Sequence, residues 1–96
     1  MYGLEKALID QIVDTIRAFG AERVVLFGSR ARGDYRQASD IDLAVYGLSG
    51  SVLPLLCAME DLPTLLRFDV VSVCPQTDRA LLTEIERDGV ELWKAE

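Results

Sequence analysis

The feature that most constrains the fold is a short, continuous apolar run, Val24-Val25-Leu26-Phe27, which ends directly at Gly28. Four apolar residues bounded by a glycine are typical of a strand and too short for a buried helix. Because the run has no polar alternation, it predicts a strand that is buried on both faces.

The rest of the chain alternates between helical and strand patterns. Leu4, Leu8, Ile12 and Ile16 recur every four residues and predict an amphipathic helix closed by Gly20. The elements expected after the first strand are a short helix within 29–35, a strand over 41–46, a helix over 52–62 with Ser51 as N-cap and Pro63 at its end, a strand over 68–73, a helix over 77–88, and an edge strand or docked tail over 90–93. This order predicts an α/β (α+β) fold with a small sheet of three to four strands, some of them parallel. The helix over 77–88 is expected to end in a Schellman motif with Gly89 at C′.

Composition excludes several classes of function. Ten Lys+Arg stand against sixteen Asp+Glu, so the formal net charge of the 96 residues is −6, which disfavours binding of long nucleic acids by bulk charge. No apolar run approaches the ~20 residues of a membrane-spanning helix, and the N-terminus does not resemble a secretory signal, so a cytoplasmic protein is expected. The absence of histidine excludes catalysis by an imidazole base. Cys57 and Cys74 are expected to be buried or half-buried free thiols.

Two aspartates, Asp40 and Asp42, are the first candidate site residues. Side chains two residues apart on a strand point to the same face, so these carboxylates converge while Ile41 and Leu43 face the core. Carboxylates suit hard divalent cations, and two such cations about 3.5–4 Å apart can clamp the attacking and leaving oxygens of a nucleotidyl transfer. The solvent-exposed face of a strand explains such a pair equally well.

Gly28 and Ser29 follow the first strand and form a second candidate feature. A strand that ends in Gly-Ser and enters a helix presents backbone N–H groups and a hydroxyl, and glycine lets a phosphate approach closely. An ordinary turn uses the same residues. Because the aspartates lie at the end of the adjacent predicted strand, a phosphate cradle and metal ligands can face one another across a cleft.

Asp69 interrupts an otherwise hydrophobic strand between Phe68 and Val70. A charge inside a short core strand is costly unless it is paired or bound to a metal. Asp69 is therefore expected either on an exposed face or as a further metal ligand. In the second case it also helps to accept the proton of an attacking hydroxyl.

Three arginines lie in the same segment of this acidic chain, and guanidinium groups match phosphate oxygens. Arg32 is the preferred candidate because it lies between two glycines. Arg30 and Arg36 are explained equally well as solvent-facing partners of nearby acids. The remaining polar and aromatic residues of interest are expected in packing, turn or capping roles: Tyr35, Tyr46, Asp34 and Ser39.

Gly28-Ser29, ten intervening residues and Asp40-Ile41-Asp42 together resemble the G-S-x₁₀-D-x-D signature of the DNA polymerase β-like nucleotidyltransferase superfamily. The string GSRARGDYRQASDIDL is similar to the minimal nucleotidyltransferases (MNT), which are small prokaryotic proteins. The resemblance covers nearly the whole chain, since FDVVSV and ERDGVELW also fit. Residues 1–96 are therefore expected to form a single minimal nucleotidyltransferase domain with a mixed sheet and about four flanking helices.

The resemblance also implies ATP as the substrate and two Mg²⁺ ions as cofactors. By it, Asp40 and Asp42 bind both metals, Asp69 completes one metal site, Gly28 and Ser29 hold the triphosphate, and Arg32 matches the ARG element. Larger relatives carry a second domain for the acceptor, which this sequence lacks. Minimal nucleotidyltransferases are commonly antitoxins of HEPN ribonuclease toxins, so the resemblance implies transfer of AMP to a tyrosine hydroxyl of a cognate HEPN toxin.

Two other functions remain open from the sequence. The domain could neutralise a toxin by binding alone, since its acidic charge suits a basic RNA-binding surface. Alternatively, it could be a nucleotidyltransferase with a different acceptor, such as a small molecule or a tRNA end. The net acidity and the missing acceptor domain argue against a tRNA.

Overall fold

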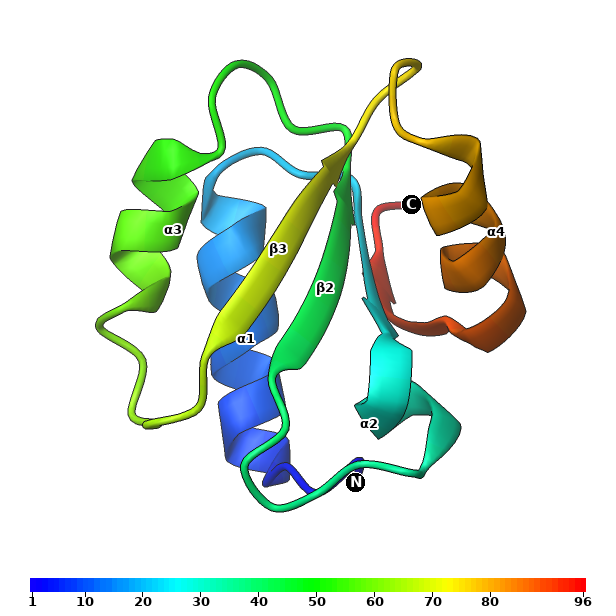
Figure 1. Ribbon diagram of the computed structural model, residues 1–96. Coiled ribbons are helices and arrows are strands. Elements are labelled where there is room, and N and C mark those ends of the chain that lie inside the picture. The colour runs from blue at the N-terminus through cyan, green and yellow to red at the C-terminus, as the bar shows by residue number, and fades with distance from the viewer.

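A computed structural model describes all residues 1–96 and shows a four-stranded mixed sheet with helices on both faces (Figure 1). The strands are β1 (Arg23–Phe27), β2 (Ile41–Tyr46), β3 (Phe68–Val73) and β4 (Val90–Lys94). The helices are α1 (Lys6–Ala18), α2 (Gly28–Arg32), α3 (Leu53–Met59) and α4 (Arg79–Asp88). The expected α/β fold with a small mixed sheet is confirmed, and the last segment is a strand rather than a docked tail.

The strand order is β3-β2-β1-β4. β1 lies between β2 and β4 and is antiparallel to both, whereas β2 and β3 are parallel. The parallel pair is joined by a crossover that contains α3 (Figure 1). Because β1 and β2 run in opposite directions, the carboxyl end of β1 lies beside the amino end of β2.

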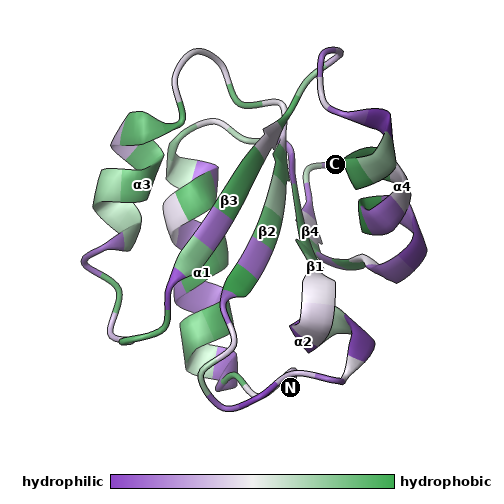
Figure 2. Ribbon diagram, viewed as in Figure 1, coloured by the Kyte–Doolittle hydropathy of each residue, from purple (hydrophilic) through white to green (hydrophobic).

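Two apolar clusters on opposite faces of the sheet explain why β1 is buried on both sides. Val24 and Leu26 belong to a larger cluster that includes residues of α1 and α3. Val25 and Phe27 belong to a smaller cluster with Ile85 of α4. In Figure 2 the strands are largely hydrophobic apart from hydrophilic bands in β2 and β3, α3 is largely hydrophobic, and α4 carries many hydrophilic residues. None of the helices is long and apolar enough to cross a membrane.

The helix ends differ slightly from the sequence predictions. α4 begins at Arg79 rather than Thr77, because Asp78 is its N-cap and accepts a hydrogen bond from the Ala80 N–H at 3.2 Å. α3 begins after Val52, although the Ser51 hydroxyl still accepts a hydrogen bond from the Leu53 N–H at 3.1 Å. Side-chain oxygens therefore satisfy first-turn donors at the start of both helices.

Gly89 is not in the left-handed conformation of a Schellman motif, so that prediction is wrong. Its φ and ψ are −66° and 141°, and the chain passes directly from α4 into β4. A Cβ at this position would overlap the Ile85 carbonyl oxygen and lie 2.6 Å from Cγ1 of Val25. The glycine is needed because a Cβ would meet both the last turn of α4 and a side chain of β1, not because of its backbone angles.

The two cysteines are exposed free thiols, so the prediction of buried or half-buried side chains is wrong. Cys57 lies on the outer side of α3, and Cys74 lies in the turn after β3. Their exposure follows from the position of both segments at the periphery of the sheet.

Candidate active site

The sheet topology brings the four parts of the sequence motif to one end of the sheet. Phe27, which precedes Gly28, is the register partner of Asp42 across the antiparallel β1–β2 pair. Asp69 is the register partner of Asp42 across the parallel β2–β3 pair. Asp40 lies two residues before Asp42, at the entry to β2. The structure therefore places Gly28, Asp40, Asp42 and Asp69 close to one another.

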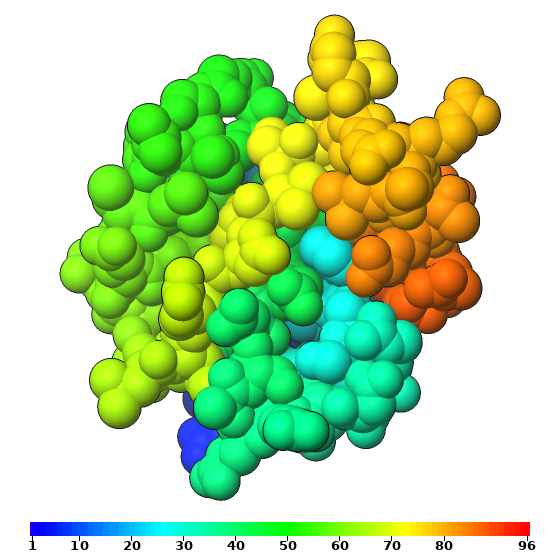
Figure 3. All heavy atoms as spheres, in the orientation of Figure 1, coloured from blue at the N-terminus to red at the C-terminus, as the bar shows by residue number.

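The alternation of β2 determines which face carries the acids. Ile41 and Leu43 are fully buried in the cluster beneath α1 and α3, as the sequence predicts. Asp42 therefore points to the opposite face, which α2 and α4 share. Figure 3 shows that residues of α2 (cyan), β2 (green) and β3 (yellow) meet on the surface of this face. No cavity is lined by the acids: the two largest, each about 450 Å³, lie elsewhere, so the site is an open surface rather than a cleft.

The pKa of Asp42 reflects both its burial and the negative charges around it. Its pKa is raised from 3.8 to about 6, chiefly by burial and then by the negative charges of Asp69, Asp40 and Glu84. A contact between the Asp42 and Asp69 side chains also contributes to the raised pKa. Three neighbouring acids thus act on Asp42, which is the arrangement in which a carboxyl resists ionisation.

Gly28 is the residue that lets the turn after β1 approach Asp42. It is buried and has a φ of +74°, a conformation that glycine adopts at little cost. A Cβ at this position would overlap Oδ2 of Asp42. Ser29 lies directly beside it, and its carbonyl oxygen accepts hydrogen bonds from the N–H groups of Gly33 and Asp34 at 2.9 and 3.2 Å. The backbone of this turn is therefore in contact with the acids.

The chemistry of the donor set decides whether these residues suit a divalent metal. The side chains as they stand form no group of three or more metal-binding residues. Nevertheless, the three aspartates offer only hard oxygen donors, which Mg²⁺ prefers. The repulsion that raises the pKa of Asp42 is also the repulsion that a cation removes. The residues fit Mg²⁺ by the chemistry of their donors.

Asp69 is exposed, so the argument that it is a costly charge inside a core strand is wrong. It is the second residue of β3, which lies at the edge of the sheet. The sequence pattern could not show that one face of this strand is open to solvent. Because Asp69 is exposed, its charge needs no partner for the stability of the fold. Only its position beside Asp42 connects it to the site.

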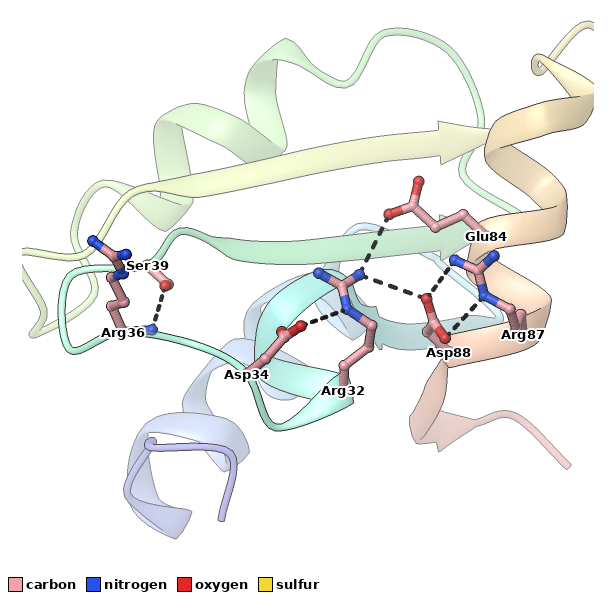
Figure 4. Close-up of polar contacts among 7 residues, drawn as sticks. All are labelled: Arg32, Asp34, Arg36, Ser39, Glu84, Arg87 and Asp88. Atoms are coloured by element: carbon pink, nitrogen blue, oxygen red, sulfur yellow. Dashed lines mark hydrogen bonds and ion pairs between the residues drawn. The ribbon is translucent and has the colours of Figure 1, made fainter.

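Arg32 projects from α2 toward α4 and is surrounded by acids (Figure 4). Its guanidinium lies 3.2 Å from Asp34, 3.5 Å from Asp88 and 3.8 Å from Glu84, measured to carboxylate oxygens. The hydrogen bond that Arg32 donates to the Asp34 carboxylate is the main cause that raises the pKa of Arg32. Asp34 and Glu84 are partly exposed, and Asp88 also pairs with Arg87. These ion pairs of Arg32 are therefore weak enough to be exchanged for others.

The other arginines of the segment differ from each other. Arg30 is buried and donates only to backbone carbonyl oxygens, which corrects the expectation of a solvent-facing side chain. Arg36 is exposed, and its backbone N–H donates to the Ser39 hydroxyl at 2.7 Å (Figure 4). Tyr35 and Tyr46 each lie under a guanidinium group at 5.1 and 4.8 Å, as expected for packing residues.

Glu84 is a member of the acidic group that the sequence analysis did not identify. It lies on α4, and its charge raises the pKa of Asp42 on β2. The only sequence signal was its spacing of four residues from Asp88, which places both acids on one side of a helix. The sequence does not show that this side faces α2 and the acids of the sheet.

Comparisons with known proteins are consistent with this geometry. A family model described as "Polymerase beta, Nucleotidyltransferase" matches residues 10–96. A comparison with curated proteins gives no match. A solved toxin-antitoxin structure with AMP-PNP has a TM-score of 0.68 and 21% identity, and the alignment covers 92% of this chain and 74% of that one.

Two further solved structures share the fold. A mutant of the toxin-antitoxin MntA-HpeT has a TM-score of 0.67 and 19% identity, with coverage of 92% of this chain and 74% of that chain. The tri-AMPylated HEPN toxin of Shewanella oneidensis in complex with MNT antitoxin gives 0.64 and 18%, with coverage of 96% and 74%. At these identities the likeness shows the fold.

Proposed function

The chain belongs to the polymerase beta nucleotidyltransferase family, and from this premise we propose that it transfers AMP from ATP to a tyrosine hydroxyl of a cognate HEPN ribonuclease toxin. It thereby acts as the antitoxin of that toxin, in the cytoplasm. The observation that carries the proposal is the meeting of Asp42, Asp69 and the Gly28 turn at one end of the sheet, with Asp40 at the entry to β2.

Asp40 and Asp42 would hold both Mg²⁺ ions, and Asp69 would complete one of the two sites. When bound, the ions neutralise the charge that builds up between the carboxylates and the triphosphate and clamp the attacking and leaving oxygens. The support in the structure is the raised pKa of Asp42, which is caused first by burial and then by the negative charges of Asp69, Asp40 and Glu84.

The Gly28-Ser29 turn would hold the triphosphate of ATP. Gly28 has no side chain between the backbone and the Asp42 carboxylate, so a phosphate oxygen can come close to both. Arg32 would add a guanidinium to this cradle once it exchanges its exposed acidic partners on α4 for phosphate oxygens.

Asp69 would help to accept the proton of the acceptor tyrosine, whose ordinary pKa is about 10. As the phenolic oxygen forms a bond to the α-phosphorus, the bond to the pyrophosphate oxygen breaks and the phenolic proton passes to the carboxylate. The exposure of Asp69 on an edge strand supports an acceptor that approaches from solvent on another protein. Two of the solved structures that share the fold are a toxin-antitoxin with AMP-PNP and an AMPylated HEPN toxin with MNT antitoxin.

The test is transfer of AMP to a cognate HEPN toxin. Purified toxin is incubated with ATP, Mg²⁺ and the wild-type chain, and intact-mass spectrometry records whether the toxin gains AMP groups. Asp40→Asn and Asp69→Asn should abolish the mass gain, whereas Asp61→Asn, an exposed aspartate outside the site, should not. An unmodified toxin in the wild-type reaction, or full transfer by Asp40→Asn, would refute the proposal.

Co-expression distinguishes catalysis from neutralisation by binding alone. A chain in which Asp40, Asp42 and Asp69 are all replaced by Asn should fail to rescue cells that express the toxin. Rescue by this triple variant at the wild-type level would instead support an antitoxin that acts by binding.

A further inference from the structure

The most deeply buried charge in the protein is the guanidinium of Arg30, which is 1% exposed. A buried charged group is stable only if its donors are satisfied within the protein. No ion pair includes Arg30, and all of its hydrogen bonds go to backbone carbonyl oxygens. The guanidinium of Arg30 therefore binds backbone carbonyl groups and does not balance the charge of an acid.

The main acceptor is the carbonyl oxygen of Ser39. Nε and Nη2 of Arg30 donate to it at 3.1 and 2.9 Å, which is a forked contact with one oxygen. Nη2 also donates to the carbonyl of Gln37 at 3.2 Å, and Nη1 donates to the carbonyl of Tyr2 at 3.0 Å. The guanidinium lies over the ring of Tyr35, 5.1 Å from its centroid.

These contacts connect the two halves of the candidate site. Arg30 directly follows the Gly28-Ser29 turn, and the Ser39 carbonyl belongs to the peptide bond that leads into Asp40. The segment between Gly33 and Asp40 contains no helix or strand. Apart from the Arg30 contacts, its bonds are short-range ones, such as Ser39 N–H to the Arg36 carbonyl at 3.0 Å. One side chain thus spans from the turn after β1 to the peptide that precedes Asp40.

We propose that Arg30 is a positioning residue that fixes Asp40 relative to the Gly28-Ser29 turn through its forked hydrogen bonds to the Ser39 carbonyl. This inference rests on the proposed function, in which Asp40 is a metal ligand. Asp42 is held in place by β2, whereas Asp40 precedes the strand: the peptide after it is held by the Ile41 N–H bond to the Arg67 carbonyl at 2.8 Å, and the peptide before it is held by Arg30. A lysine keeps the positive charge but lacks the planar guanidinium group, so it cannot form the same set of hydrogen bonds to three carbonyl groups.

The experiment is a double-mutant cycle on metal affinity, which does not depend on turnover. Mn²⁺ is titrated into the chain with AMP-PNP bound, and electron paramagnetic resonance measures the free ion. Arg30→Lys is expected to weaken Mn²⁺ binding about tenfold. In the Asp40→Asn background the same substitution should change the affinity by less than twofold, because the ligand that Arg30 positions is already absent. The matched control, Arg36→Lys, alters an exposed arginine of the same loop and should leave Mn²⁺ binding unchanged.

Different outcomes of the cycle would refute different claims. If Arg30→Lys weakens Mn²⁺ binding equally in both backgrounds, Arg30 only stabilises the fold and the positioning role is overturned. If Asp40→Asn alone leaves the affinity of the wild-type chain unchanged, the metal-ligand role of Asp40 in the proposed function is wrong. If Arg30→Lys is unfolded at the assay temperature, Arg30→Gln replaces it in the cycle, since its planar amide is shorter and cannot form the forked contact with the Ser39 carbonyl. The same non-additivity with Asp40→Asn is expected, and additivity would again overturn the positioning role.

Discussion

Replacement of Asp42 by asparagine should stabilise the protein in the absence of metal. The pKa of Asp42 is raised from 3.8 to about 6 by burial and by neighbouring acids. The folded chain therefore binds this proton more tightly than the unfolded chain does. Its favourable contribution to folding is complete below a pH of about 3.8 and is lost as the pH rises through about 6. At neutral pH the ionised Asp42 carboxylate therefore destabilises the folded chain, and an uncharged asparagine does not.

The raised pKa sets the size of the effect. The change from 3.8 to about 6 corresponds to about 3 kcal/mol in free energy of unfolding at most. Because Asp42 is only half-buried, solvent screening reduces this to about 1–2 kcal/mol. Asparagine has nearly the same volume, and its amide can donate to the Asp69 carboxylate. For a domain of this size, about 1 kcal/mol raises the melting temperature by roughly 4–8 °C.

Urea unfolding in the presence of EDTA at pH 4, 7 and 8 measures this directly. The Asp42→Asn variant should gain about 1–2 kcal/mol at pH 7 and 8, and the gain should shrink toward zero at pH 4. Asp61→Asn removes an equal charge from an exposed position and should change the free energy of unfolding by less than about 0.5 kcal/mol. The Asp42→Asn variant should also gain less stability than wild type from added Mg²⁺ and ATP.

A loss of stability at pH 7 would refute this reasoning, because it would mean that the ionised Asp42 carboxylate accepts a structural hydrogen bond. A gain of the same size at every pH would also refute it, since the benefit would then come from packing rather than from a removed charge.

Three other substitutions test separate features. Gly28→Ala should destabilise the chain by at least about 1 kcal/mol more than Gly33→Ala in urea unfolding, because both glycines have positive φ but only the first would place a Cβ against Asp42; equal losses would show that the close contact is unimportant. Gly89→Ala should cost about 1–3 kcal/mol despite an ordinary φ, since its Cβ would meet a carbonyl of α4 and a side chain of β1, and a neutral result in a thermal melt would contradict that crowding. Glu84→Gln should lower the pKa of Asp42 in a carboxyl ¹³C NMR titration, because one of the negative charges that raise it is gone; an unchanged or higher pKa would argue that Glu84 lies too far away.

Much of the fold could be predicted from local pattern because its causes are local. The run from Val24 to Phe27 is apolar at every position because helices cover both faces of its strand. The alternation of Ile41 and Leu43 with Asp42 has the two-residue period of a strand, so the face of the carboxylate followed from the sequence. The nearness of Asp42 to the Gly28 turn followed from the motif and from the expectation of neighbouring strands.

What could not be predicted depends on how elements pack against one another. For Asp69 the choice between an exposed strand face and a buried metal ligand stayed open, because the sequence does not show that β3 is an edge strand. Gly89 was assigned to a left-handed cap because the distance between α4 and β1, which excludes a side chain there, is a tertiary property. For Arg30 the sequence offered a phosphate-binding or a solvent-facing role, and the buried role was missed because its acceptors are backbone carbonyls, which every sequence has.

The most direct measurement of the central claim is anomalous scattering from Mn²⁺ in crystals of the chain grown with AMP-PNP. The account predicts two manganese peaks next to the triphosphate, both in contact with Asp40 and Asp42 and one also in contact with Asp69. Manganese bound away from these carboxylates, or a nucleotide bound with no metal beside Asp42, would contradict it.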